Sequence, residues 1–182
     1  GSGIADPSSQ QTTVDMTADR NITAVFAPHI YNVTINQTGK GTITPSGTHA
    51  YGSILAISAT PATGYDFSHW DGYGPDSNTS QSTNLTIQQD HAIVAVFTPL
   101  AYNLETTATV GGSTGINESS PYLFDSNYTL FASPEFGYDF SHWDSPSGSL
   151  SLLGSQSNSI SSVFVQGDAS YHANFSLITY NL

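Results

Sequence analysis

The sequence predicts an all-β protein made of two small tandem modules of antiparallel strands, each a compact sandwich or a β-grasp-like sheet, with no significant helix. The string Gly-Tyr-Asp-Phe-Ser-His-Trp-Asp occurs at Gly64–Asp71 and again at Gly137–Asp144, so the chain is a tandem array. Apolar and polar residues alternate along several segments, and this period of two is typical of strands. No segment combines a helical pattern with capping residues.

Comparison of the two copies separates inward from outward positions along each expected strand. One set of alternate positions is apolar or aromatic in both copies, whereas the other set tolerates polar residues, which places the first set in the core. In the first copy the inward positions are Tyr31, Val33, Ile35, Leu55, Ile57, Ala59, Leu85, Ile87, Ile93, Ala95 and Phe97. In the second copy they include Tyr128, Leu130, Ala132, Val163, Val165, Tyr171, Ala173 and Phe175.

Turn-forming residues lie between these strands. The segments Thr38–Gly41 and Gln88–His91 are expected to form tight turns, because Gly, Asn and Asp adopt positive φ at low cost. Pro61 and Pro134 are expected to end the middle strand of each unit, since proline cannot donate to a strand ladder. The second copy carries extra residues at Ser145–Ser159, whose Ser and Gly content predicts a surface loop.

The duplicated string places three aromatic residues in each module, and together these form the expected core signature. Tyr65 and Phe67 share one face of a strand, but Trp70 falls on the opposite face under strict alternation. A β-bulge at Ser68–His69 is predicted to return Trp70 to the core, because an exposed Trp in every repeat would be a liability. Packing of Trp70 beneath a loop is the alternative. The signature residues are Tyr65, Phe67, Trp70, Tyr138, Phe140 and Trp143.

The repeat also predicts the domain boundaries. Residues 31–101 form the first module, residues 102–179 form the second, and residues 180–182 begin a further repeat. Residues 1–30 are expected to contain a short cloning remnant followed by the closing hairpin of a preceding repeat. Alternatively, the segment Thr12–Pro28 belongs to the first module. The residues of this segment that are expected to point inward are Val14, Met16, Ile22, Ala24 and Phe26.

The composition argues against several functional classes. The 182-residue chain has 14 Asp and Glu against 2 Lys and Arg, which gives a formal net charge of −12 at pH 7. Such a surface repels phosphate groups, so nucleic-acid binding is not expected. The absence of cysteine excludes a disulfide framework. No apolar stretch approaches the length of a membrane span, so membrane insertion is not expected either.

Short motifs follow one another in the same order in both copies. They are a Tyr-led strand, a Gly-rich hairpin, Ala-x-Pro, Gly-Tyr-x-Phe-x-x-Trp and a closing Ala-x-Phe. This order and spacing resemble the divergent InlB B-repeat family, although the second copy departs from the pattern in its Ser-rich insertion and in Glu135–Phe136. The resemblance implies small β modules strung along a large bacterial surface or secreted protein, located outside the cell and acting as a spacer, stalk or adhesive segment.

Residues suited to catalysis do not form a known catalytic motif in this sequence. A nucleophile elbow, a Gly-rich phosphate loop and a His-Glu-x-x-His zinc motif are all missing, and we therefore expect no enzyme activity. His69 and Asp71, like their counterparts His142 and Asp144, lie two positions apart and share a strand face. Such a pair could hold a proton or a metal, but zinc needs three or four protein ligands, so a simple surface pair is the favoured interpretation.

Calcium and sugars are the remaining ligand hypotheses, and no other cofactor is expected. Asp71, Asp76 and Asn78 place oxygen ligands in a Gly-containing loop that suits a hard cation, although the pattern is not that of an EF-hand. Three tyrosines near expected turns could stack on sugar rings, but half-buried packing on the sheet is the favoured interpretation. They are Tyr51, Tyr73 and Tyr122.

Three functional hypotheses remain open. The favoured one is a non-catalytic stalk or spacer, in which the short linkers Thr98–Ala101 and Ser176–Thr179 limit the freedom of successive modules and Pro99 stiffens the first linker. Its partners are the neighbouring repeats of the same chain. The second hypothesis is a module that binds an extracellular glycan or protein, with or without calcium. The third is an accessory domain of a secreted enzyme.

Overall fold

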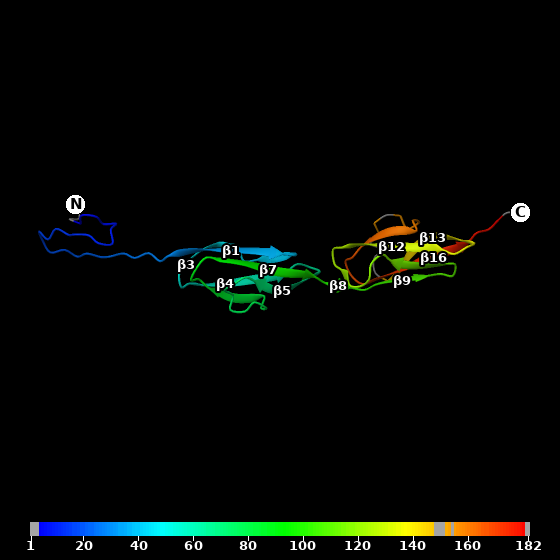
Figure 1. Ribbon diagram of the computed structural model, residues 1–182, viewed down its shortest axis with the longest axis horizontal. Coiled ribbons are helices and arrows are strands. Elements are labelled where there is room, and N and C mark those ends of the chain that lie inside the picture. Colours follow the sequence, from blue (N-terminus) through cyan, green and yellow to red (C-terminus); the bar gives the residue numbers. More distant parts are fainter. Residues whose placement is uncertain (1–3, 148–151, 154, 181–182) are drawn as a thin grey trace.

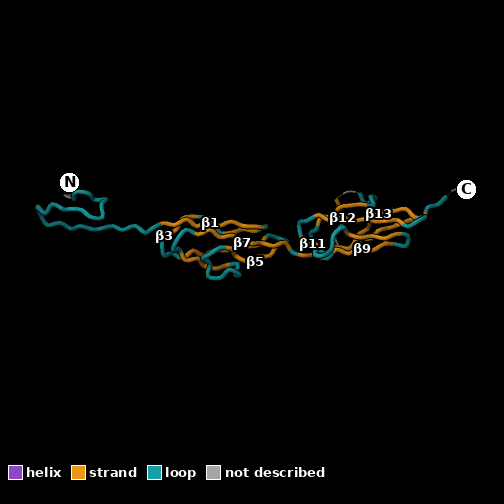
Figure 2. The backbone as a smooth tube through the Cα atoms, in the orientation of Figure 1, coloured by secondary structure: helices purple, strands orange, loops and turns teal. Residues whose placement is uncertain are grey.

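The computed structural model describes residues 4–147, 152–153 and 155–180. Within them every regular element is a strand, so the all-β prediction is confirmed. The strands form two bodies placed end to end, module 1 and module 2, and the chain before module 1 extends away from it (Figure 1, Figure 2). Module 1 contains β1 (Ile30–Thr38), β2 (Gly41–Ile43), β3 (Gly47–Ala50), β4 (Ile54–Pro61), β5 (Tyr65–Asp71), β6 (Ser82–Thr86) and β7 (His91–Pro99). Module 2 contains β8 (Ala101–Tyr102), β9 (Leu104–Ala108), β10 (Gly112–Ile116), β11 (Tyr122–Leu123), β12 (Asn127–Pro134), β13 (Tyr138–Ser147), β14 (Leu152–Leu153), β15 (Ile160–Phe164) and β16 (Ala169–Leu177).

Module 1 is a sandwich of two sheets around one core. The strand order is β3-β1-β7-β5 in one sheet and β2-β4-β6 in the other. Side chains of both sheets meet in a single buried cluster, which favours the sandwich over the β-grasp-like sheet. The cluster consists of Val33, Ile35, Ile57, Ala59, Trp70, Leu85, Ile87, Ile93, Ala95 and Phe97. Every inward position predicted for this module lies in the cluster or packs against it.

Module 2 repeats this architecture with small changes. Its sheets have the orders β13-β16-β9 and β10-β12-β15-β14, and the pair β11-β8 corresponds to the pairing of β3 with the start of β1. The hydrogen bond between the first strand and an Asp in the turn before the last strand is also found in both modules. The N–H of Asn32 donates to Asp90 at 2.8 Å, and the N–H of Asn103 donates to Asp168 at 2.8 Å. The buried cluster is Leu104, Tyr122, Tyr128, Leu130, Ala132, Trp143, Val163, Val165, Tyr171 and Ala173.

The pairing of the first and last strands departs from the sequence prediction. The sequence predicts antiparallel strands throughout, but β1 pairs with β7 in parallel, and β9 pairs with β16 in parallel. Alternation of side chains indicates the face of a strand and not its direction, so the residue pattern alone does not reveal this pairing. Because the first and last strands run the same way, the chain enters a module at one end and leaves it at the other.

The predicted β-bulge is present in both modules. The register of β5 against β7 shifts at Ser68, and the register of β13 against β16 shifts at Ser141. The shift moves the side chains that follow to the other face of the strand. Trp70 and Trp143 are therefore turned inward, and both are fully buried.

The segment before module 1 does not form the predicted closing hairpin. Among the described residues no strand precedes Ile30, and a single isolated bridge joins Ile4 to Val14. Met16 and Phe26, which were expected to point inward, are 64% and 91% exposed. In module 1 the closing strand β7 lies between β1 and β5, whereas the described residues before Ile30 include no strand equivalent to β1 or β5. Its apolar side chains therefore have no sheet to pack against.

Part of the predicted surface loop at Ser145–Ser159 is strand. β13 runs on to Ser147, and β14 pairs with β15 as an additional edge strand. Leu152 packs against the core of module 2, which explains why this short piece is extended despite the Ser-rich composition around it. Residues 148–151 and 154, which also belong to the predicted loop, lie outside the described residues.

Candidate functional site

The two modules meet through the residue that links them. Leu100 lies between β7 and β8, and its backbone N–H donates to the carbonyl of Gly64 at 2.8 Å. Its own carbonyl accepts a hydrogen bond from the N–H of Phe124 at 2.9 Å. The backbone of this one linker residue is thus hydrogen-bonded both to module 1 and to module 2. The linker predicted at Thr98–Ala101 is therefore part of the folded structure rather than a free tether.

Aromatic packing closes this contact, which we call the joint. The rings of Phe124 and Tyr65 are edge to face, with centroids 6.0 Å apart and an interplanar angle of 82°. Edge-to-face pairs stabilise beyond the area that they bury. Gly64 leaves space for the ring, because a methyl group at this position would overlap Phe124, and its φ of +80° favours glycine. The joint consists of Lys40, Gly64, Tyr65, Leu100, Tyr102, Phe124 and Asp125.

A charged pair spans the joint beside these rings. The Lys40 ammonium, in the turn between β1 and β2, contacts the Asp125 carboxylate of module 2, and the Tyr65 hydroxyl lies 3.5 Å from the same carboxylate. The hydrogen bond to Asp125, and then its charge, raise the pKa of Lys40 above its ordinary value of 10.5. Because the Lys40 side chain is 60% exposed and that of Asp125 is 27% exposed, solvent screens the pair in part and its contribution to stability is small.

The entry end of module 1 has a surface equivalent to the one that module 2 contributes to the joint, but it lacks the carboxylate of Asp125. Tyr31 and Tyr51 have ring centroids 6.3 Å apart, close to the 6.2 Å of the corresponding pair of rings in the joint. Gly52, with φ of +77°, stands at the position equivalent to Asp125, with φ of +64°. Asp tolerates this left-handed conformation better than most residues. Asp125, which stands in place of a glycine, thus provides a carboxylate that the Lys40 side chain contacts.

Module 1 also has an open groove of about 770 Å³. It lies between the loop that follows β5 and the turn that precedes β7. The lining residues are Gly72, Tyr73, Gly74, Pro75, Asp76, Ser77, Asn78, Thr86, Gln88, Gln89 and His91. Most of them are polar, so the groove is suited to a hydrogen-bonding ligand rather than to an apolar one.

The three calcium candidates are only partly brought together. Asp76 and Asn78 line the groove, whereas Asp71 does not, and its carboxylate accepts a hydrogen bond from the N–H of Gly72 at 2.9 Å. In the part of the chain that the structure describes, no group of three or more His, Asp or Glu side chains is placed to hold a metal ion. The calcium hypothesis therefore rests on two side chains of the groove and stays a prediction.

The three tyrosines proposed to stack on sugars have different surroundings. Tyr73 is 82% exposed at the groove. Tyr51 is exposed as well, and it lies against Tyr31 at the entry end of module 1. Tyr122 is buried, packs edge to face on Tyr128 with centroids 5.0 Å apart, and is a core residue. For Tyr122 the favoured interpretation, packing on the sheet, therefore holds, and the sugar-stacking hypothesis fails because its ring is buried.

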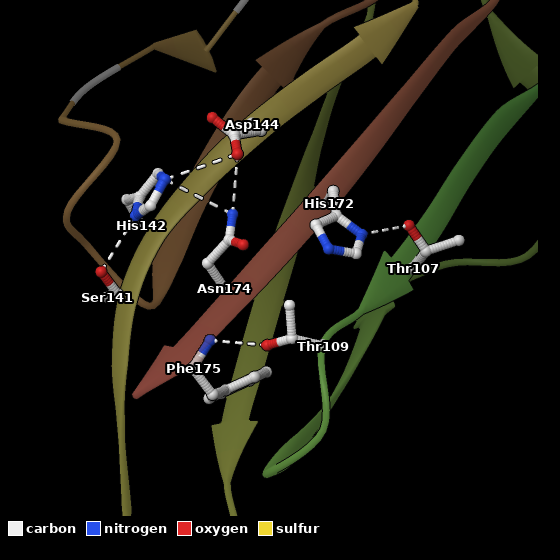
Figure 3. A network of polar contacts seen from close by, with 8 residues as sticks. All are labelled: Thr107, Thr109, Ser141, His142, Asp144, His172, Asn174 and Phe175. Carbon is white, nitrogen blue, oxygen red and sulfur yellow. Dashed lines mark hydrogen bonds and ion pairs between the residues drawn. The ribbon is translucent and has the colours of Figure 1, made fainter. Parts of the chain in front are cut away.

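The expected His–Asp pair forms in module 2, as a surface contact. His142 Nε2 lies 3.4 Å from Asp144 Oδ2, and the Asn174 amide donates to the same oxygen at 2.8 Å (Figure 3). Both members of the pair are about half exposed. Module 1 has Val96 in place of Asn174, so its own carboxylate lacks this partner. An exposed pair with one amide provides too few ligands for zinc.

The sequence model of the divergent InlB B-repeat domain matches residues 31–101 and 102–179. The chain belongs to this family. Among curated proteins and solved structures, none matches the chain. Membership of the InlB B-repeat family fits a repeat segment of a surface-associated bacterial protein. Within the described residues, no helix has the length and apolar character needed to cross a membrane.

The signature aromatic residues have two roles in these InlB B-repeats. Phe67 and Trp70 pack together with centroids 5.6 Å apart, and the equivalent pair in the second repeat has the same spacing. Tyr65 packs against the core as well, but it also lies at the exit end of its repeat, where it contacts the next one. The sequence pattern indicated the core residues and missed this second role. Its counterpart Tyr138 covers Gly111 at the exit end of the second repeat.

Proposed function

We propose that this chain is a non-catalytic spacer segment of a bacterial surface or secreted protein, and that it works outside the cell by holding distant parts of that protein apart. The observation that supports the proposal is the joint, in which the backbone of Leu100 is hydrogen-bonded to both modules. A flexible tether would let successive modules fold back on each other. A structured contact restricts their relative orientation.

The direction of the strands supports the same role. In each module the first and last strands are parallel neighbours, so entry and exit lie at opposite ends. Modules that are linked in this way add their lengths along one line. β1 has 9 residues, which corresponds to a strand length of about 30 Å. An array of such repeats therefore gains length with each repeat that is added.

The composition of the surface supports a segment that stays solvated and does not associate with itself. Carboxylates outnumber basic side chains by 14 to 2, so like charges keep separate copies apart. Only one cationic side chain, Lys40, is placed at the joint, where it meets a carboxylate of the following module. The contact between consecutive modules is thus complementary in charge, whereas contacts between unrelated faces are repulsive.

Small-angle X-ray scattering of the whole chain tests the proposal. We expect the profile of an extended rod. Gly64→Ala should broaden the distribution of dimensions, because the added methyl group overlaps Phe124 in the joint. Gly137→Ala is the matched control, since a methyl group there meets nothing within 4 Å. A folded-back profile, or one that fits two freely jointed modules, would contradict the spacer role.

A further inference from the structure

We infer that the groove of module 1 binds a neutral saccharide, a role separate from that of a spacer. The residues that would contact the ligand are Tyr73, Asp76, Asn78, Gln88 and Gln89, from the loop after β5 and the turn before β7. The groove volume of about 770 Å³ lies within the range of roughly 300–1,000 Å³ typical of small-molecule sites. Its combination of one exposed aromatic ring with several amides and a carboxylate matches the chemistry of a sugar ring.

Four polar side chains of the groove have no hydrogen-bond or ion-pair partner among the described residues. Among the described residues, the side chains of Asp76, Asn78, Gln88 and Gln89 are exposed and make no hydrogen bond or ion pair. A carboxylate accepts hydrogen bonds, and an amide both donates and accepts them. Adjacent hydroxyl groups of a sugar, each of which donates and accepts, can therefore pair with them. No Lys or Arg lines the groove, which disfavours anionic sugars.

Tyr73 supplies the apolar part of the site. Its side chain is 82% exposed although it belongs to a loop that is otherwise tied to the module. An aromatic ring combines a flat apolar face with a polar edge, so it can cover the C–H face of a sugar while the hydroxyl groups bond to the amides. Among the described residues the Tyr73 ring makes no aromatic contact and its hydroxyl makes no hydrogen bond.

The loop is positioned before any ligand binds. The N–H of Trp70 donates to the carbonyl of Asn78 at 2.6 Å, and the N–H of Asp76 donates to the carbonyl of Asn84 at 2.9 Å. These bonds attach the loop to β5 and to β6. A ligand therefore does not have to order the loop, which lowers the entropic cost of binding.

A buried histidine holds Tyr73 in place. His91 is 6% exposed, and its Nδ1 lies 3.1 Å from the carbonyl oxygen of Tyr73, while its ring lies against Gly74. Within the described residues its Nε2 is buried without a hydrogen-bond partner. Such a nitrogen destabilises a core. Module 2 has Ala169 at the equivalent position and still folds as a sandwich, so the histidine is explained by the support that it gives to the loop.

Module 2 serves as an internal control because it lacks two residues of this site. In the turn before the last strand Gly167 and Ala169 replace Gln89 and His91, while Gln166 keeps the place of Gln88. The hollow beside this turn is only about 180 Å³, and its lining combines apolar residues such as Leu104 and Val165 with the polar Gln166 and Asp168. Binding is therefore expected at one repeat and not at the other.

An NMR titration of the complete, isotope-labelled chain tests the inference. The probes are methyl glycosides of neutral hexoses and of N-acetylhexosamines, added into the millimolar range. At least one is expected to give saturable shifts of the backbone amides at residues 72–78 and 86–91, and none at residues 166–169. Tyr73→Ala should weaken this binding by about tenfold or more. Tyr180→Ala is the matched control, since Tyr180 is also 82% exposed and lies outside the groove.

Several outcomes would overturn the inference. They are an absence of shifts with every glycoside, shifts of equal size in both modules, and binding that Tyr73→Ala leaves unchanged. A parallel titration with calcium chloride separates sugar from ion: shifts of the groove with calcium alone would replace the saccharide site by a cation site. Because the groove lies away from the joint residues, its failure would leave the scattering result for the spacer role unaffected.

Discussion

The loop after β5 in module 1 packs over His91, whereas in module 2 β13 continues past the same point to Ser147. At the position equivalent to His91, module 2 has Ala169. The strands beneath these loops pair in the same way in both modules, and both cores bury a Trp behind a bulge. The strand pairing and core, which end-to-end assembly requires, are thus kept, while the loop that defines the groove varies. We therefore propose a structural role for both repeats and a binding role for one of them.

The largest expected effect concerns the two tryptophans. Trp70→Ala and Trp143→Ala should each lower the free energy of unfolding of their own module by about 3–5 kcal/mol, because each leaves a large cavity. Circular dichroism during urea unfolding measures the loss in the substituted module, while the fluorescence of the remaining tryptophan reports on the other module. A small loss of stability in that other module is expected through the joint. Equal losses in both modules would show one cooperative unit and would remove the distinction between them.

Substitution of the glycine that begins each aromatic string separates two effects on stability, namely backbone strain and disruption of the joint. Gly64 and Gly137 have φ of +80° and +89°, so Ala at either site should cost about 1–2 kcal/mol. Gly64→Ala should cost more, because its methyl group overlaps Phe124, whereas that of Gly137→Ala contacts nothing within 4 Å. Urea unfolding measures the difference. If both variants lose the same stability, backbone strain explains the whole loss, and the contact with Phe124 in the joint contributes nothing to stability.

High pH should weaken module 2 more than module 1. Burial raises the pKa of Tyr171 above its ordinary value of 10.0, and module 1 has Ile93 at the equivalent position. Below pH 10 the tyrosine is neutral in both the folded and the unfolded chain, so its contribution is fully present. Above about pH 10 the unfolded chain loses the proton first, and stability falls as pH rises.

Tyr171→Phe should remove this loss while leaving stability near neutral pH almost unchanged. The measurement is urea unfolding at about pH 8 and about pH 11, with Trp143 as the probe in a Trp70→Phe background. The same pH dependence in module 1, followed through Trp70, would contradict the assignment to Tyr171.

The charged pair of the joint should have a smaller effect. Lys40→Met and Asp125→Asn are expected to be non-additive, and their coupling should weaken at high salt because the pair is partly exposed. The raised pKa of Lys40 means that this stabilisation is present below pH 10.5 and is lost as pH rises through the higher folded value. Glu135→Gln, which removes an exposed carboxylate at the exit end of module 2, is the control. Strict additivity would show that the pair does not couple the modules.

The smallest expected effect is that of calcium on the melting temperature. Of the three candidate ligands only Asp76 and Asn78 line the groove, while the Asp71 carboxylate accepts a hydrogen bond from the N–H of Gly72. We therefore expect no change in Tm on adding calcium. Differential scanning calorimetry with and without the ion measures this. A rise in Tm that Asp76→Asn abolishes would establish a cation site in module 1 and would add to the difference between the modules.

The core could be predicted from the sequence because the two copies differ in informative places. Ile54 of module 1 corresponds to Asn127 of module 2, which indicated an outward position, and Ile54 is exposed. β4 and β12 end at Pro61 and Pro134, as the missing N–H of proline predicts. Strand direction was beyond this reasoning, since the same alternation fits a parallel and an antiparallel neighbour.

The joint could not be predicted, because its residues are distant in the sequence. Lys40 and Asp125 are 85 positions apart, and a periodic pattern does not indicate which ends of two modules meet. One signal was present: Asp125 stands where the other copy has Gly52 at positive φ. The groove was indicated only in part, through Asp76, Asn78 and Tyr73, because the contribution of His91 depends on a contact across 18 positions.

The central claim, that the joint fixes the orientation of the two modules, is tested most directly by a distance between them. The chain has no cysteine, so Thr60→Cys and Ser133→Cys, at equivalent exposed positions of β4 and β12, give two unique spin-labelling sites. Pulsed electron spin resonance should yield one narrow distance distribution, which broadens in Gly64→Ala and stays narrow in Gly137→Ala. A broad distribution in the unmodified joint, or one that Gly64→Ala does not alter, would contradict the account.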